Sequence, residues 1–493
     1  MSELATTAKK SIKYPVLCLI SLFMMFVFGK VVPTWSTVTP VGVSMLGVFL
    51  GALLMTMSTN QTFWPPVIGI FAMVMCGYVT ANGALSTWFG NTTIQQIIWV
   101  SALAGALSDS GAINVLAQKM MRIKALKGRP LLFLFALFGM VLICSALAGS
   151  PTAMLLLWYP ILDGICDSCG IRKDSDLKRA LLLGVYISCM GAYIFPFKGV
   201  QMSSIAITSA VLENYGLTFN QGAYFITATL AVIAFVALYT LFIKFVWRID
   251  LTPLASFDAS TLDFKAENSK MNKRQKILMG AMLLGIFWLF IGPFLQGGLK
   301  EIYNTIGNTW VWIAIVGILT MVHMDGKPLI DGALMLKNKT MWGIVAMAGC
   351  FVMCGSAISS DDLGIKTWIS QVLGPLVSGA SWPVLIILCV VIATVFTNIT
   401  NGMPVSFTLN AIAVPFAAEM VLAGQIADAT PLGTAIIMSG MCAFLTYGAI
   451  AYAPLLLGRE EMTHKFLWTK GVVTNLIYIV VACVICIIGG YVL

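Results

Sequence analysis

Charged residues are scarce in this sequence. They make up 10% of its 493 residues, whereas hydrophobic residues make up 59%. A soluble domain carries about 25% charged and about 45–50% apolar residues, so the composition excludes a soluble enzyme, a disordered scaffold and a secreted disulfide framework. It indicates an all-α polytopic membrane protein, whose apolar segments are long enough to span the bilayer as helices.

Histidines and clustered metal ligands are also lacking. The two histidines, His323 and His464, fall at expected helix ends, and most of the twelve cysteines lie inside apolar runs. Cys166 and Cys169 form a CxxC pair, but neither a nearby histidine nor a second pair completes the four ligands of a zinc site. We therefore expect no enzyme activity, no cofactor and no metal other than Na⁺. The net charge of +9 is spread along the chain, which predicts no nucleic-acid partner.

Eleven apolar runs are long enough to cross a bilayer, which requires about 20 helical residues. They lie at about 14–31, 40–57, 63–81, 94–118, 179–197, 222–247, 277–295, 307–323, 341–357, 432–453 and 468–492. Two further stretches, 131–164 and 382–420, are broken by the sequences GSPT and TNITNGMP. With halves of about 15–18 residues, each is predicted to be a re-entrant helical hairpin that returns to the side it entered from.

Basic residues predict the orientation in the membrane. With the N-terminus in the cytoplasm, 25 of the 29 Lys and Arg residues fall in cytoplasmic segments, as the positive-inside rule requires. Residues 1–39 then hold an N-terminal tail and a retained first transmembrane helix, because no cleavage site follows the first apolar run. The expected location is the cell membrane (plasma or inner membrane), in contact with lipid.

The sequence contains an internal repeat. The first copy occupies residues 40–248, a polar cytoplasmic linker occupies 249–276, and the second copy occupies 277–493. Four pairs of segments keep their order and a spacing of about 250 residues: 83–93 with 332–340, 108–113 with 360–365, 149–152 with 402–405, and 187–195 with 438–446. Because each copy holds five spans and a hairpin, the second copy is predicted to be inverted in the membrane. Inverted repeats with broken helices indicate a substrate site near the midplane.

The two hairpin tips are the candidate substrate site. Each tip starts a new helix, whose N-terminus carries about half a positive charge and unpaired N–H donors that attract an anion. The candidate substrate-binding residues are Ser150, Pro151, Thr152, Asn398, Thr400, Asn401, Gly402 and Lys198. Lys198 either pairs with a substrate carboxylate or extends toward the membrane surface.

Hydroxyl groups and unwound carbonyls near the tips are candidate Na⁺ ligands. The candidate residues are Ser145, Gly149, Ser150, Ser188, Gly191, Thr394, Thr397, Asn398 and Ser439. For any single Ser or Thr the alternative is a hydrogen bond to its own helix, and for the small residues it is helix packing. The TNITNGMP cluster favours the functional interpretation, because two asparagines inside a span are costly unless their polar groups are satisfied.

This arrangement resembles the ion transporter superfamily, and most closely the divalent anion/sodium symporter (DASS) family of di- and tricarboxylate carriers. Members of that family have a Ser-Asn-Thr motif at each hairpin tip. Ser150 and Thr152 correspond to its hydroxyl positions at the first tip, and either Asn398 or Asn401 corresponds to its amide at the second. The resemblance implies a homodimer and an elevator-like transport domain that includes both hairpins.

The predicted function is secondary active transport of small carboxylates, driven by Na⁺. One alternative keeps the fold but changes the cargo, as in a Na⁺/H⁺ antiporter that depends on Asp109 or Asp361, or an oxyanion exporter. Another is a carboxylate exchanger without Na⁺ coupling. The sequence places no carboxylate in the middle of a span in a proton-relay pattern, which disfavours the antiporter.

Overall fold

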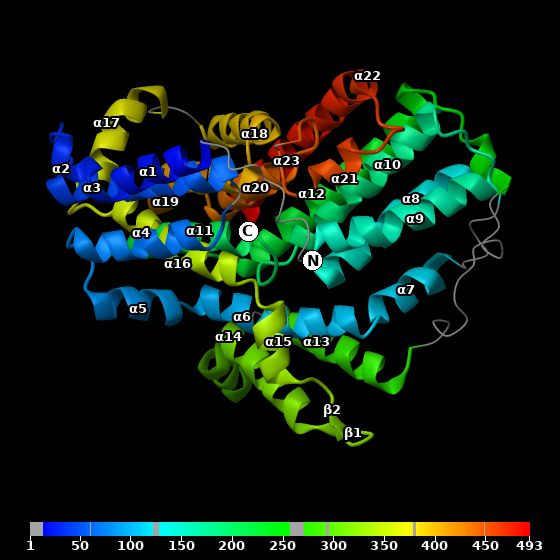
Figure 1. The fold of residues 1–493 in the computed structure, drawn as a ribbon, viewed down its shortest axis with the longest axis horizontal. Coiled ribbons are helices and arrows are strands. Elements are labelled where there is room, and N and C mark those ends of the chain that lie inside the picture. Colours follow the sequence, from blue (N-terminus) through cyan, green and yellow to red (C-terminus); the bar gives the residue numbers. More distant parts are fainter. Residues whose placement is uncertain are drawn as a thin grey trace.

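The structure is a computed structural model that describes residues 13–59, 61–121, 128–256, 271–291, 295–377, 381–447 and 449–493. It is built almost entirely of helices, as Figure 1 shows. The one sheet is a short antiparallel pair, β1 (His323–Met324) and β2 (Lys327–Pro328). The all-α fold predicted from the sequence is confirmed.

Helices of the first half run in the following order. They are α1 (Lys13–Phe26), α2 (Phe28–Val31), α3 (Pro40–Thr59), α4 (Trp64–Met75), α5 (Ala81–Phe89), α6 (Thr92–Asp109), α7 (Ala112–Met121), α8 (Pro130–Ala148), α9 (Pro151–Ser168), α10 (Asp176–Ser188), the 3₁₀ turn η2 (Cys189–Tyr193), α11 (Met202–Asn214), α12 (Gln221–Leu241), the π-helical turn η3 (Phe242–Val246) and η4 (Thr252–Ser256). Of the predicted linker 249–276, residues 257–270 lie outside the described part of the chain.

Helices of the second half run in the following order. They are α13 (Lys273–Ile291), α14 (Gly298–Met321), α15 (Gly332–Lys339), α16 (Trp342–Ser359), α17 (Ile365–Val377), α18 (Trp382–Ile399), α19 (Gly402–Leu422), α20 (Thr430–Met441), α21 (Ala453–Leu457), α22 (His464–Phe466), η8 (Leu467–Gly471) and α23 (Val472–Val492). The six helices α15 to α20 each start about 250 residues after α5 to α10. The inverted relation of the two halves in the membrane stays a prediction.

Seven helical segments within the described residues are long and apolar enough to cross a membrane. They are Pro130–Ala148, Gln221–Val246, Gly298–Met321, Trp342–Ser359, Trp382–Ile399, Gly402–Leu422 and His464–Val492. Some predicted spans are divided: the run 94–118 becomes α6 and α7, because Gly111 adopts a left-handed conformation with φ 72°. The polytopic class is therefore supported, and the number of eleven spans stays a prediction.

Both predicted hairpins are pairs of helices that pack against each other, α8 with α9 and α18 with α19. Their helices have 19, 18, 18 and 21 residues. The expected length of about 15–18 residues therefore fits α9 and α18, whereas α8 and α19 are longer. In α9 the helix continues past the apolar run to Ser168, because the carboxylate of Asp163 is paired with neighbouring cations and does not interrupt the helix. The return of each pair to its side of entry stays a prediction.

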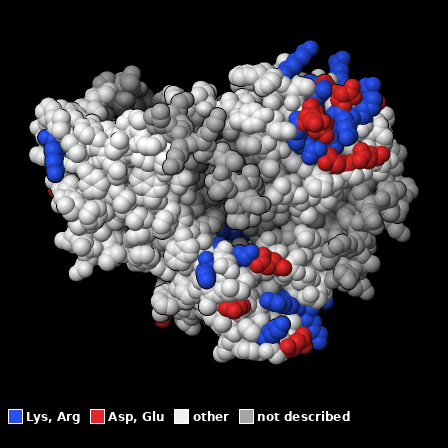
Figure 2. All heavy atoms as spheres, viewed as in Figure 1, with Lys and Arg blue, Asp and Glu red and all other residues white. Residues whose placement is uncertain are grey.

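Ion pairs join the first hairpin to both halves of the molecule. Asp163 of α9 accepts hydrogen bonds from Lys178 of α10 and, at 2.8 and 2.9 Å, from Arg459, which follows α21. Lys178 is only 3% exposed, so its buried ammonium relies on its ion pair with Asp163. Figure 2 shows charged side chains gathered in a few patches of the visible face, with broad uncharged surface between them. The uncharged surface is what a lipid-facing protein requires.

The carboxylate of Asp176, at the start of α10, makes a contribution to stability that depends on pH. Hydrogen bonding to Lys470 lowers the pKa of Asp176 below its usual 3.8. Because the folded-state pKa is depressed, the stabilisation is fully present at neutral pH and is lost as the pH falls through that folded-state value.

We predict that Asp163→Asn destabilises the protein. The amide removes the carboxylate that pairs with the buried Lys178 ammonium, and partial exposure of the site limits the expected cost to about 1–3 kcal/mol. Thermal unfolding in detergent measures the effect, with the exposed Asp174→Asn as the matched control. An unchanged unfolding temperature for Asp163→Asn would show that this network does not hold the two halves together.

Candidate functional site

The first hairpin tip is a two-residue turn between α8 and α9. Gly149 ends α8 in the left-handed conformation, with φ 70°. Ser150 caps α9 by accepting a hydrogen bond from the Ala153 N–H, and Pro151 occupies the first helical turn, where its missing N–H costs nothing. Thr152 follows with an exposed side chain. The first tip therefore presents a helix N-terminus, as predicted.

A second break lies beside this tip, where α10 gives way to η2. The predicted Na⁺ ligand Ser188 is fully buried, but its hydroxyl donates to the Gly184 carbonyl of its own helix. Gly191 lies against α8: a Cβ there would be 2.3 Å from the Leu142 carbonyl oxygen. Ser188 is thus bonded to its own helix and Gly191 packs on a neighbouring helix, which are the alternatives to Na⁺ binding. The carbonyls of this unwound segment remain candidate ligands.

Lys198 lies in the irregular segment between η2 and α11, and it reaches the first tip. Its side chain is 2% exposed, and its Nζ donates to the Leu147 carbonyl oxygen at 2.9 Å, one residue before the end of α8. Its ammonium also lies 5.1 Å from the centre of the Phe195 ring. Of the two alternatives that the sequence left open, extension toward the membrane surface does not agree with this burial, and the residue lies beside the candidate site.

The second hairpin tip joins α18 to α19. Asn401 caps α19 by accepting a hydrogen bond from the Met403 N–H, and the Thr400 hydroxyl donates back to Phe396 of its own helix. Gly402 packs directly on α20: a Cβ at this position would be 1.7 Å from the Gly440 carbonyl oxygen. The tip therefore also presents a helix N-terminus, held against the break that follows α20.

Asn398 is the most fully bonded side chain of the second tip. Its Oδ1 accepts the N–H groups of Phe444 and Leu445, both at 3.0 Å, and its Nδ2 donates to the carbonyls of Thr394 and Cys442. Residues 442–447 are unwound, so the Cys442 carbonyl and the Phe444 and Leu445 N–H groups have no helical partner. In this conformation the Asn398 amide holds the broken segment, and its polar atoms are already occupied.

Three hydroxyls at the tips are buried without a hydrogen-bond partner within the described residues. They belong to Ser145, Thr394 and Thr397, which are between 0 and 2% exposed. All three were predicted as Na⁺ ligands from the sequence. A fourth predicted ligand, Ser439, is fully buried at 3.4 Å from the Tyr478 hydroxyl. A buried hydroxyl that lacks a partner costs free energy, so these groups differ from the back-bonded hydroxyls around them.

Tyrosines connect the two unwound segments, and sequence reasoning missed them. Tyr186 donates to the Ala443 carbonyl at 2.6 Å, and Tyr193 donates to the Tyr452 hydroxyl at 3.1 Å. Tyr224 in turn donates to the Tyr193 carbonyl at 2.9 Å. A signal was available, because tyrosines beside broken apolar helices need a partner for each hydroxyl. These bonds bring the two breaks, and through them the two tips, into one polar core.

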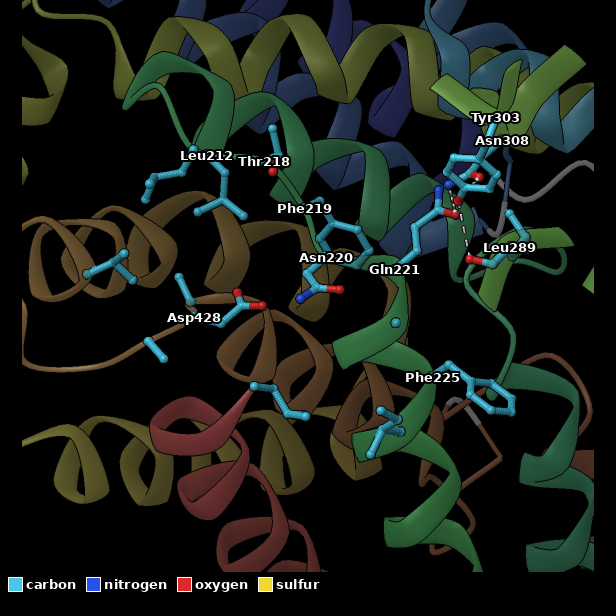
Figure 3. A pocket seen from close by; sticks show the side chains of 17 residues that line it. Leu212, Thr218, Phe219, Asn220, Gln221, Phe225, Leu289, Tyr303, Asn308 and Asp428 are labelled. Carbon is cyan, nitrogen blue, oxygen red and sulfur yellow. Dashed lines mark hydrogen bonds between the residues drawn. The ribbon is translucent and has the colours of Figure 1, made fainter. Parts of the chain in front are cut away.

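A cavity of about 780 Å³ lies elsewhere in the molecule, between α11, α12, α13, α14 and the loop before α20. Figure 3 shows its amide-rich wall, where Tyr303 bonds to Asn308 and Asn308 bonds to Gln221. Asp428 is part of the same lining. None of the predicted substrate or ion ligands lines this cavity, so it is separate from the candidate site.

The fold is that of a multi-pass membrane protein, and a family match defines its class as a transporter rather than an enzyme. Residues 53–439 match the family model of the citrate transporters, CitMHS. The chain belongs to that family, and it is a secondary transporter of carboxylate-type anions. The narrower resemblance to the DASS family stays a prediction.

The fold is also found among solved structures. The chain is similar to the YdaH transporter of Alcanivorax borkumensis, whose crystal structure has an unusual topology, with a TM-score of 0.57, 13% identity and 97% of each chain covered. At this identity the likeness concerns the fold alone. No curated protein matches the sequence.

We predict that Gly402→Ala disturbs the second tip. The added methyl group would collide with the backbone of Gly440, which has no flexible side chain to move, and overpacking of this kind costs about 1–3 kcal/mol. The matched control is Gly280→Ala, at an exposed helical position where a Cβ meets nothing within 4 Å. Thermal unfolding compares the two variants, and equal unfolding temperatures would contradict the close approach of α19 and α20.

Proposed function

We propose that this citrate transporter family member is a secondary active carrier of small di- and tricarboxylates driven by Na⁺. The single observation that carries the proposal is the pair of hairpin tips, each with a capped helix N-terminus beside buried, unpartnered hydroxyls. The helix N-termini favour an anion, and the hydroxyl and carbonyl oxygens favour a hard cation such as Na⁺.

Substrate carboxylates are proposed to bind at the helix N-termini. Ser150 and Asn401 cap α9 and α19, so the remaining first-turn N–H groups point toward the tips. The other proposed substrate contacts are Pro151, Thr152, Gly402 and Lys198. The tips lack an acidic side chain in the sequence, and this suits a site that binds an anion.

Sodium is proposed to bind behind the second tip. Thr394 and Thr397 lie one turn apart on α18, and both hydroxyls are buried without partners among the described residues. Energy is available for the coupling: each net positive charge that enters gains about 2.3 kcal/mol per 100 mV, and a tenfold ion gradient adds about 1.4 kcal/mol. Two or three Na⁺ ions are enough to concentrate a dianion.

We further propose that the hairpins and broken helices move as one body, in an elevator-like cycle within a homodimer at the cell membrane. The bonds between these elements support the rigid body: Lys178 and Arg459 hold α9, Asn398 holds the segment after α20, and Tyr186 joins α10 to that same segment. A body so connected carries a bound solute without internal rearrangement.

A Na⁺/H⁺ antiporter based on Asp109 or Asp361 receives less support. Asp109 forms a 2.6 Å ion pair with Lys339, and Asp361 forms a 3.0 Å ion pair with Lys366. The two carboxylates are 47% and 82% exposed. Exposed, paired carboxylates of this kind are ordinary surface ion pairs, and they do not line the tips.

Uptake by proteoliposomes tests the proposal. Labelled citrate, succinate and malate are offered to the purified protein with an inward gradient of either Na⁺ or K⁺. Saturable uptake that is faster in Na⁺ is the expected result. Uptake that is equal in the two salts would favour an exchanger, and the absence of saturable uptake for every carboxylate would overturn the proposal.

We predict that Thr397→Val weakens Na⁺ binding without loss of stability. Valine has nearly the same shape as threonine, and the Thr397 hydroxyl gives up no hydrogen bond in this structure. The Na⁺ concentration for half-maximal uptake is expected to rise about tenfold, which corresponds to about 1.4 kcal/mol. The control is Thr408→Val on α19, whose hydroxyl bonds back to Pro404. A Thr397→Val variant with wild-type Na⁺ dependence would move the ion site elsewhere.

A further inference from the structure

A pocket of about 440 Å³ lies where three segments far apart in sequence meet. They are the loop between α9 and α10, the residues that follow η3, and the turn η8, which contributes Lys470. The basic residues of the sequence predict a cytoplasmic location for all three. Figure 2 shows charged side chains gathered at this end of the molecule, where Figure 1 places α10 and α22. The volume falls within the range of about 300–1,000 Å³ that small ligands occupy.

The lengths of two helical segments place the pocket at the level of the lipid headgroups. Gln221–Val246 ends at the pocket and His464–Val492 begins beside it, with 26 and 29 residues. At a rise of 1.5 Å per residue they measure about 39 and about 44 Å, whereas the hydrocarbon core is about 30 Å thick. Next to the pocket, Phe245 is 60% exposed and Trp468 is 62% exposed. These apolar side chains are suited to contact with lipid.

Positive charge exceeds negative charge around the pocket. The carboxylate of Asp176 is shared by two cations, Lys470 at 2.6 Å and Arg179 at 3.0 Å. Both oxygens of Asp250 accept a hydrogen bond from a threonine hydroxyl two residues further on. Arg248 lines the pocket, and in the described part of the chain its guanidinium has neither a hydrogen bond nor an ion pair. The pocket therefore keeps a net positive charge and a set of free N–H donors.

The backbone is irregular where the two long helical segments border the pocket. Both η3 and η8 are π-helical turns, and Arg248 adopts a left-handed conformation with φ 51°. Such turns and such backbone angles are often found at functional sites. The ammonium of Lys470 lies 5.8 Å from the centre of the Trp247 ring and 5.3 Å from that of Phe466. Two rings and an ion pair thus hold this cation in place.

We propose that the pocket binds the headgroup of an anionic phospholipid. Arg248 supplies the free donors, because a guanidinium pairs with two oxygens of a phosphate at once. Lys470 adds a positive charge at a fixed position. The net positive charge disfavours a choline headgroup, which carries a positive charge of its own. The acyl chains then lie along the exposed side chains of Phe245 and Trp468, and the lipid joins the start of α10 to the end of α12 and to η8.

Thermal unfolding of the purified protein in detergent tests this proposal. Phosphatidylglycerol, phosphatidylcholine or inorganic phosphate is added at the same concentration in separate samples. The wild type is expected to unfold at a higher temperature with phosphatidylglycerol than with either of the others. Equal stabilisation by the two lipids contradicts a site for an anionic headgroup. Stabilisation by inorganic phosphate as strong as that by phosphatidylglycerol identifies free phosphate as the ligand, and it contradicts the lipid site.

The variant Arg248→Gln separates the pocket from the basic surface around it. The phosphatidylglycerol concentration for half of the stabilisation is expected to rise about tenfold, because a charged hydrogen-bond donor is lost. The matched control is Arg129→Gln, which removes an exposed arginine that precedes α8 and does not line the pocket. This control should respond to phosphatidylglycerol as the wild type does. Equal shifts in the two variants show a general attraction to the basic surface, and they overturn the proposal.

A second measurement counts the bound lipid and does not depend on unfolding. The wild type and Arg248→Gln are each equilibrated with an equal mixture of phosphatidylglycerol and phosphatidylcholine, and native mass spectrometry identifies the lipid that stays bound. The wild type is expected to retain phosphatidylglycerol in preference, and Arg248→Gln is expected to lose this preference. Equal retention of phosphatidylglycerol by the two proteins contradicts a headgroup site at Arg248.

Discussion

The structure depends on one constraint: backbone N–H and C=O groups at four breaks must be satisfied where no water is available. Each unsatisfied group in a membrane interior costs several kcal/mol. The breaks lie between α8 and α9, between α10 and α11, between α18 and α19, and between α20 and α21. Side chains rather than helical neighbours satisfy them. Asn398 accepts two N–H groups of the last break, Gln201 donates to two carbonyls of the second, and Tyr186 joins the two across the core. The breaks that we propose as the solute site are therefore also points that hold the two halves together.

The two halves satisfy the broken backbone with similar geometry but with different side chains. In each half, one polar side chain links the hairpin tip to the neighbouring broken helix: Lys198 reaches Leu147 from the break, and Asn398 reaches the break from the tip. The first link is a lysine, and the second is a neutral amide.

Much of the fold could be predicted from the sequence, because composition and local helix signals suffice for it. Pro151 and Ser150 mark a helix start by properties of their own residues, and the structure places them at the first turn and the cap. The ion pairs of α9 could not be predicted, because Arg459, the partner of Asp163, lies far away in sequence. For the same reason Asn398 looked like a ligand for solute: only the fold shows that residues 442–445 take up its hydrogen bonds. Long-range partners, rather than local preference, decide these cases.

Hydrogen bonding distinguishes two kinds of hydroxyl near the tips, those that bond to their own helix and those that do not. Ser188 and Thr400 were as plausible in sequence as Thr394 and Thr397, yet the first two bond back to their own helices. A back-bonded hydroxyl contributes to the helix and needs no ligand. Thr394 and Thr397 are buried and forgo that bond. Because each lies in a helix whose carbonyls were available to it, as they were to Ser188, these two hydroxyls are the ones that we propose as Na⁺ ligands.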